Sequence, residues 1–168
     1  MIDLLLKRAE NEIVTAEKLK KMSEDSETKT FMEIPEDMTF YSAVISHSYY
    51  AIFYSAKAYL LSRNIPLLSK QGQHQQVYFE FRKPVQSGIV DIELLEIYED
   101  VKGKAESLLG ILKTEKDKRK DFVYETIPQA NKQPADDSLK NAVFFVSHIK
   151  KFLSKDEISD EDKLDTEE

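Results

Sequence analysis

The sequence predicts an all-α fold, an up-and-down bundle of about five helices around a central hydrophobic helix at residues 39–64. Between Thr39 and Ser62 this stretch contains one charged residue, Lys57, and it contains neither glycine nor proline. It is far longer than a typical strand, which favours a helix. Seven of the seventeen aromatic residues of the chain lie in it. A helix this hydrophobic must be enclosed by other helices or by a second subunit.

The central helix carries three rows of side chains at helical spacing. The large apolar row consists of Ile45, Tyr49, Ile52, Phe53, Ala56 and Leu60. The row of mostly small residues consists of Val44, Ser48, Ala51, Ser55, Ala58 and Ser62. The third row consists of His47, Tyr50, Tyr54 and Lys57. Each of these side chains combines a polar group with an aromatic ring or an aliphatic chain. We expect the first row to fill a core and the second to let a helix approach closely. The third row is unusual for an ordinary buried seam and could line a polar crevice.

Amphipathic patterns predict the surrounding helices. They cover residues 2–22, residues 73–82, and a long helix that starts near residue 91 and runs past Leu112. Pro84 is expected to end the second of these, and Gly88 marks the following turn.

The remaining segments are expected to be loops, apart from one last helix. Pro128 and Pro134 predict a loop at residues 126–135, after which Asp136 or Asp137 caps the last helix. Residues 23–38 also predict a loop because they combine a polar first half with Pro35. Its apolar side chains, Phe31, Met32 and Ile34, are expected to fold back on the bundle or on a second copy.

Composition and charge suggest one domain at residues 1–154 and an acidic, disordered tail at residues 155–168. The tail holds eight acidic residues and two lysines, which accounts for most of the net charge of −7 and leaves the body nearly neutral. The chain has no cysteine, so neither a disulfide nor a thiolate metal site is available. No signal sequence or membrane span is visible, and we expect a cytoplasmic protein.

Three segments together resemble the HEPN domain family. They are KRAENEIVTAEKLKKMS, then SHSYYAIFYSAKAYLLSRN followed by a loop and His74, and finally AVFFVSHIKKFL. HEPN domains are small helical modules of prokaryotic toxin–antitoxin pairs, nuclease effectors and nucleotidyltransferase partners. The resemblance implies a helical bundle, a homodimer and a nucleotidyltransferase-type partner protein.

The nuclease motif of that family is an Arg followed after a short spacing by a His. In the matching segment, KDKRKDFVYETI, Arg119 takes the Arg position, but Tyr124, Glu125 and Thr126 stand where the His is expected. Tyr has an unperturbed pKa near 10 and is a poor substitute for His in proton transfer near neutral pH. The missing His argues against catalysis by this motif. Arg119, Lys120 and Tyr124 could still bind phosphate and stack on a base, or they could simply be a solvated helix end.

The three histidines do not form a metal-ligand pattern, and no phosphate-cradling glycine loop or nucleophile elbow is present. We favour a hydrogen-bonded core role for His47, a cap or helix-start hydrogen bond for His74, and a surface or groove position for His148. No cofactor or metal is expected.

The leading hypothesis is a HEPN-like, non-catalytic module that binds a nucleotide, RNA or a partner protein. Its candidate binding residues are Arg119, Lys120, Tyr124 and the row His47, Tyr50, Tyr54 and Lys57. One alternative is a metal-independent ribonuclease toxin that uses Arg119 with Tyr124, Glu125 or His47. Another is a purely structural, dimeric interaction protein.

Overall fold

The computed structural model describes the backbone of residues 1–67, 72–117 and 131–164, and the side chains of residues 1–67, 72–108 and 131–154. The six helices of these residues are α1 (Ile2–Glu24), α2 (Ser26–Phe31), α3 (Tyr41–Ser62), α4 (Gln73–Gln86), α5 (Ile92–Asp117) and α6 (Lys132–Leu164). No strand occurs in the described parts of the chain, and the prediction of an all-α bundle is confirmed.

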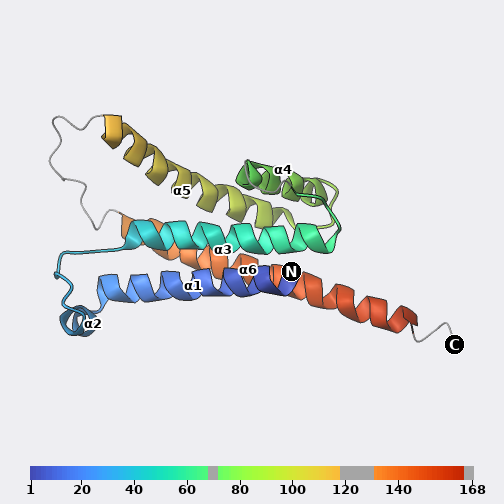
Figure 1. Ribbon diagram of the computed structural model, residues 1–168, viewed down its shortest axis with the longest axis horizontal. Helices are drawn as coiled ribbons and strands as arrows, with labels where there is room; N and C mark the ends of the chain where they lie inside the picture. Colours follow the sequence, from blue (N-terminus) through green and yellow to red (C-terminus); the bar gives the residue numbers. More distant parts are fainter. Residues whose placement is uncertain (68–71, 118–130, 165–168) are drawn as a thin grey trace.

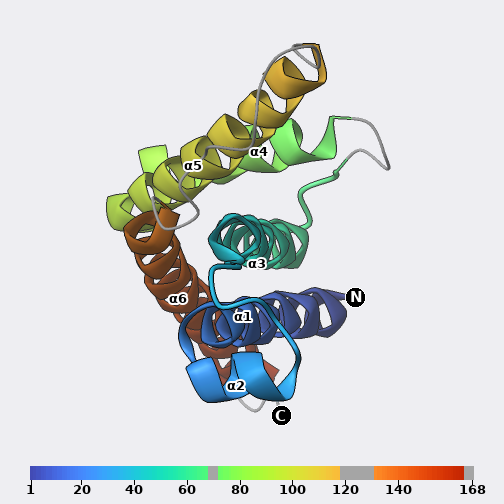
Figure 2. The same ribbon diagram turned by 90° about the vertical axis from the view of Figure 1, so that its left-hand side faces the viewer.

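Four long helices, α1, α3, α5 and α6, alternate in direction along the length of the bundle (Figure 1). The end view shows α3 between α1 on one side and α4 and α5 on the other, with α6 alongside (Figure 2). Helix α3 contacts all four of these neighbours, most extensively α1 and then α6. The predicted central position of α3 is therefore confirmed.

Small side chains let the neighbouring helices approach α3 closely. Ala51, Ser55 and Ala58 are fully buried, as are the larger Ile52 and Leu60. The buried Ser55 hydroxyl is satisfied because it donates to the Ala51 carbonyl at 3.0 Å. Two hydrophobic clusters result, one around the second half of α3 and one around its first half, and the partly buried side chains of Ile13 and Tyr49 contact both.

One predicted loop and two predicted helix boundaries were wrong, each for a local reason. Part of the predicted loop at residues 23–38 is the short helix α2, which begins where the Asp25 carboxylate accepts the Thr28 N–H at 2.8 Å. Helix α4 continues past Pro84 to Gln86, since a proline this close to a helix end removes only one hydrogen bond. Helix α6 begins at Lys132, so Pro134 lies in its first turn, where no N–H donor is needed.

The segment after α2 and the end of α6 also differ from the simplest expectation. Phe31 and Met32 do not fold back on the bundle but are exposed, and only Ile34 is partly covered. The α6 backbone remains helical to Leu164, beyond the predicted start of the acidic tail, and the division of the chain at residue 154 stays a prediction. No helix in the described ranges is both long and apolar enough to cross a membrane.

Candidate functional site

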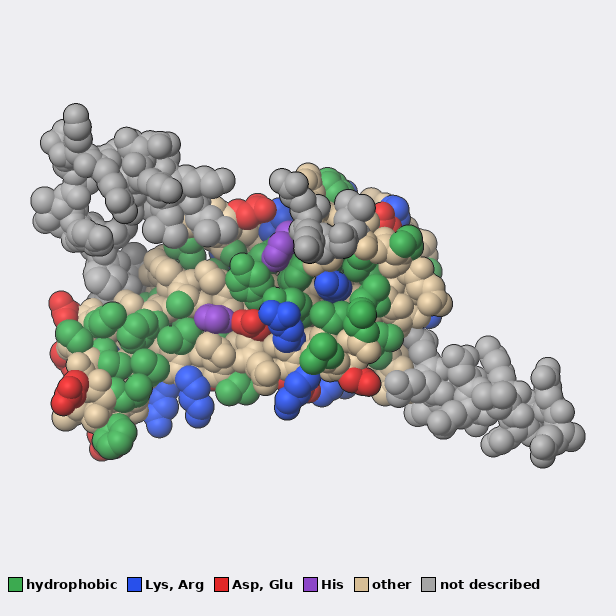
Figure 3. Space-filling view, in the orientation of Figure 1, with side chains coloured by type: hydrophobic (Ala, Val, Ile, Leu, Met, Phe, Trp, Pro, Cys, Tyr) green, Lys and Arg blue, Asp and Glu red, His purple; other side chains and the backbone are tan. Residues whose placement is uncertain are grey.

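The third row of α3 lies at the surface where α3 meets α1 and the start of α4. Helix α1 adds Arg8 and Glu12 to it, and α4 adds Gln73 and His74. We call the surface formed by Arg8, His47, Tyr50, Tyr54, Lys57 and His74 the tyrosine–cation face. Figure 3 shows histidine side chains at the surface, near basic, acidic and hydrophobic ones.

Aromatic rings form a continuous layer on this face. The rings of Tyr50 and Tyr54 are stacked with centroids 6.3 Å apart, and the Tyr50 ring meets the edge of His74 at 5.7 Å. The His74 ring in turn stacks on Phe53 at 4.0 Å with an interplanar angle of 16°. Because 38% of Tyr50 is exposed, this layer is open to a planar ligand on its solvent side.

Two cations flank the aromatic layer. The Arg8 guanidinium lies 4.5 Å above the centre of the Tyr54 ring, and the Lys57 ammonium donates to Oε1 of Gln73 at 3.0 Å. Neither cation forms an ion pair with an acidic residue among the described side chains. Burial lowers the pKa of Lys57, and repulsion from Arg8 lowers it further. The carboxylate of this face, Glu12, pairs with His47 and with neither of the two cations.

The surroundings of His74 favour its neutral form. Burial lowers its pKa below the ordinary value, and the positive charge of Lys57 acts in the same direction. Its Nδ1 lies 2.9 Å from the Tyr49 hydroxyl, whose pKa is raised, first by burial and then by the charge of Glu106. The protonated Tyr49 hydroxyl can donate to Nδ1, which leaves the ring proton on Nε2 as a hydrogen-bond donor.

His47 is paired with Glu12 of α1. Its Nδ1 lies 2.6 Å from Oε2 of Glu12, and its side chain is one-third exposed. The predicted hydrogen bond is present, but His47 lies at the surface and not in the core. A carboxylate on Nδ1 fixes the ring and favours Nε2 as the nitrogen that is free to accept a proton.

The predicted candidates fall into two groups. The structure places His47, Tyr50, Tyr54 and Lys57 on one face, as the row predicts. Arg119, Lys120 and Tyr124 lie outside the described residues, and their role stays a prediction.

Arg8 and Glu12 were not among the predicted site residues, and His74 forms a different contact from the one predicted. The N-cap of α4 is Gly72 and not His74, whose Nδ1 instead bonds with the Tyr49 hydroxyl of α3. His148 lies partly buried in α6, where its Nδ1 is 2.9 Å from the Phe144 carbonyl oxygen. No sequence pattern singles out Arg8 and Glu12, because only the packing of α1 on α3 brings them to this face.

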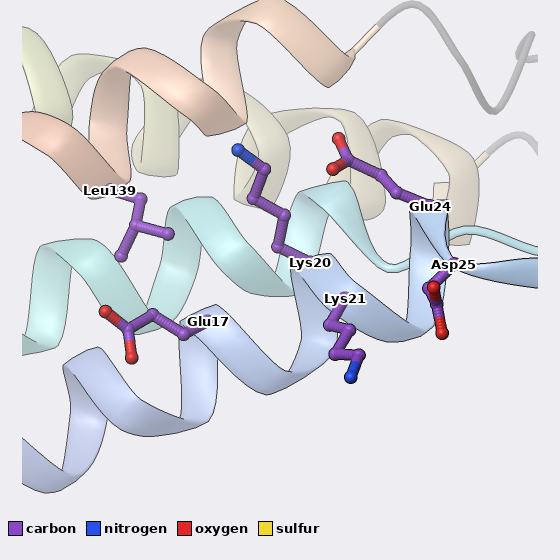
Figure 4. Close-up of a pocket in the computed structure, with 6 residues that line it drawn as sticks. All are labelled: Glu17, Lys20, Lys21, Glu24, Asp25 and Leu139. Carbon is purple, nitrogen blue, oxygen red and sulfur yellow. The ribbon is translucent and has the colours of Figure 1, made fainter. Parts of the chain in front are cut away.

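A polar groove lies elsewhere, between α1 and α6 (Figure 4). Its lining residues are Glu17, Lys20, Lys21, Glu24, Asp25 and Leu139. Lys20 forms an ion pair with Asp136 at 2.6 Å, and Lys132 pairs with Glu24, so charges in and beside the groove connect the two helices. Among the described residues, no group of three His, Asp or Glu side chains is placed to hold a metal ion.

The described residues form an all-α helical bundle, and this face gives it a surface of aromatic rings flanked by two cations. No protein-family model matches the chain, and neither a curated protein nor a solved structure matches it.

Proposed function

We propose that the tyrosine–cation face binds a nucleotide or a short single strand of RNA, as a HEPN-like binding module would. The observation that carries this proposal is the pair of cations, Arg8 and Lys57, without a described acidic partner beside stacked tyrosines. A phosphate group would relieve the repulsion between the cations. A base would stack on the exposed ring of Tyr50.

The charge of the whole chain favours a small ligand over a long duplex. Residues 155–168 carry most of the net charge of −7 and leave the body nearly neutral, so a polyanion would find little attraction beyond this face. A mononucleotide or a short strand needs only the cations of the face itself. The neutral His74 adds a donor that could select among base edges, since its Nε2 is not used by Tyr49.

The test is a calorimetric titration of the purified protein with adenosine and uridine monophosphates, a short RNA strand and inorganic phosphate. We expect Arg8→Ala or Lys57→Ala to weaken nucleotide binding about tenfold, because each removes a charge-assisted hydrogen bond. Tyr50→Ala should weaken nucleotide binding by a similar factor but leave the affinity for inorganic phosphate unchanged.

Two matched controls separate this site from general effects. Lys104→Ala removes a lysine that pairs with Asp100 on α5, and Phe79→Ala removes an exposed ring on α4. Both should bind nucleotide as the wild type does. Absence of binding, or equal affinity in the Lys57→Ala and Lys104→Ala proteins, would overturn the proposal.

A second candidate function is metal-independent RNA cleavage, and the His47–Glu12 pair favours it. A carboxylate-oriented imidazole can accept the proton of a 2′-hydroxyl. Cleavage of a short RNA in the presence of a chelator should be lost in His47→Gln if this activity is present. RNA that stays intact would leave binding as the function.

Pairing with a nucleotidyltransferase-type protein and homodimer formation remain further proposals. Helix α3 itself does not require a second subunit, since Tyr50 is its only exposed large apolar side chain.

A further inference from the structure

A surface distinct from the tyrosine–cation face lies on α2 and the turn that follows it. Three large apolar side chains are exposed there, 89% of Phe31, 49% of Met32 and 45% of Met38. A single exposed apolar residue is common on protein surfaces and needs no explanation. Three of them on one short segment are a candidate interaction surface, and methionine adapts readily to different partners.

Hydrogen bonds fix the backbone of this segment, so the exposure is not a consequence of fraying. Lys29 is buried, and its ammonium donates to the Glu36 carbonyl. The N–H of Ile34 donates to the Lys29 carbonyl at 2.9 Å, and the N–H of Phe40 donates to the Ser23 hydroxyl at 2.8 Å. The apolar side chains are thus presented on an ordered backbone, which lowers the entropy lost on binding.

The charge around these side chains is strongly negative. Residues 23–38 contain six acidic residues, Glu24, Asp25, Glu27, Glu33, Glu36 and Asp37. The only basic residue of the segment is the buried Lys29. At the end of the molecule drawn on the left of Figure 3, acidic side chains lie among hydrophobic ones.

The polar groove between α1 and α6 adjoins this segment. Asp25 lines the groove and is also the residue whose carboxylate caps α2 (Figure 4). Glu17 and Glu24 add carboxylates along the groove, Lys20 and Lys21 add two ammonium groups, and Leu139 adds an apolar contact. Lys20 is paired with Asp136, and Glu24 is paired with Lys132. An elongated ligand that covers Phe31 could therefore continue along α1.

We propose that Phe31, Met32 and Met38, with the carboxylates around them, form a docking surface for a basic amphipathic helix of a partner protein. Apolar residues of such a helix would cover the three exposed side chains, and its lysines and arginines would meet the carboxylates. A second copy of this chain would bring the same negative charge to the contact. Nucleic acid and an anionic membrane surface would be repelled for the same reason.

The test uses the full chain and a synthetic peptide of lysine and leucine that forms an amphipathic helix. A second peptide of the same composition, with its order changed so that no apolar face forms, measures the contribution of charge alone. Fluorescence anisotropy should show the amphipathic peptide binding about tenfold more tightly than the reordered one, and Phe31→Ser should remove that advantage. Glu27→Gln should weaken the binding of both peptides.

Each substitution has a control of the same kind. Leu4→Ser changes an exposed apolar residue of α1, and Glu93→Gln changes an acidic residue in the first turn of α5, as Glu27 is in the first turn of α2. Both control proteins should bind as the wild type does. Equal binding of the two peptides, or an unchanged advantage in Phe31→Ser, would overturn the proposal. A dimer that dissociates in Phe31→Ser would instead assign the surface to a second copy.

Discussion

At the scale of single residues, His74 makes stability depend on pH. Burial and the nearby Lys57 lower its pKa in the folded protein, whereas the unfolded chain has a value near 6.5. As the pH falls, the unfolded state therefore takes up a proton before the folded state does. The stability contributed by neutral His74 is fully present above about pH 6.5 and is lost as the pH falls through the lower folded pKa.

We accordingly expect the urea midpoint of the wild type to decrease between about pH 7 and about pH 5. His74→Asn should reduce this decrease, because Asn does not titrate. His148→Asn is the matched comparison, since it removes a histidine of α6 that is not part of the tyrosine–cation face. If His74→Asn and the wild type lose stability in parallel over this range, His74 is not the group responsible.

The residues of the candidate site were predictable only where one helix determines their arrangement. His47, Tyr50, Tyr54 and Lys57 share a face because of helical spacing, and the sequence displays that spacing directly. Arg8 and Glu12 join them through the packing of α1 on α3, which depends on contacts between residues far apart in sequence. Periodicity within a single segment carries no information about such contacts.

At the scale of helices, the small residues of α3 determine how closely its neighbours can pack. Ala58 is fully buried, so a larger side chain has no space there. Ala58→Leu should lower the free energy of unfolding by about 1–3 kcal/mol, because overpacking forces side chains or helices apart. Chemical denaturation followed by circular dichroism measures this change.

Thr15→Leu on α1 is the control for the Ala58→Leu substitution. Thr15 is exposed, and its hydroxyl bonds only to the carbonyl of Asn11 in its own helix. We expect a change within about 0.5 kcal/mol there. Equal stability of Ala58→Leu and the wild type would show that the helices around α3 can move apart without cost.

Helix positions were predictable from hydrophobic periodicity, but several helix ends were not. The prolines at positions 84 and 134 were assigned to boundaries, yet both lie inside helices near an end. Proline is compatible with the first turn because no N–H donor is required there, and near the last turn it removes a single bond. Helix α2 is only six residues long and begins at the Asp25 cap. A helix this short is not predicted by hydrophobic periodicity, because it is too short to show a repeat.

At the scale of the whole molecule, α3 joins the two hydrophobic clusters into one structure. Tyr49 and Ile13 contact both clusters, and α3 contacts α1, α4, α5 and α6. A bundle in which four helices pack on one central helix should unfold in a single cooperative transition. The class of fold followed from the sequence because one segment was too hydrophobic to remain exposed, and four neighbours enclose it in the described structure.

Phe81 provides the most direct test of this cooperativity. Its fully buried ring lies 5.9 Å from the ring of Tyr59 on α3, 5.9 Å from that of Tyr98 on α5 and 5.4 Å from that of Phe145 on α6. Phe81→Ala should lower the free energy of unfolding by about 3–5 kcal/mol, because it removes a buried ring and leaves a cavity. Helicity and tyrosine fluorescence should still change together in urea, at a lower midpoint than in the wild type.

Phe79→Ala is the matched control for Phe81→Ala. Phe79 lies two residues away on the same helix with its ring exposed, so its loss should change stability by no more than about 0.5 kcal/mol. A Phe81→Ala protein in which tyrosine fluorescence changes before helicity would mean that α4 can separate from an otherwise intact bundle. Coincident transitions at a lower midpoint would instead mean that loss of the Phe81 ring destabilises the helices together, because that ring contacts α3, α5 and α6 across the core.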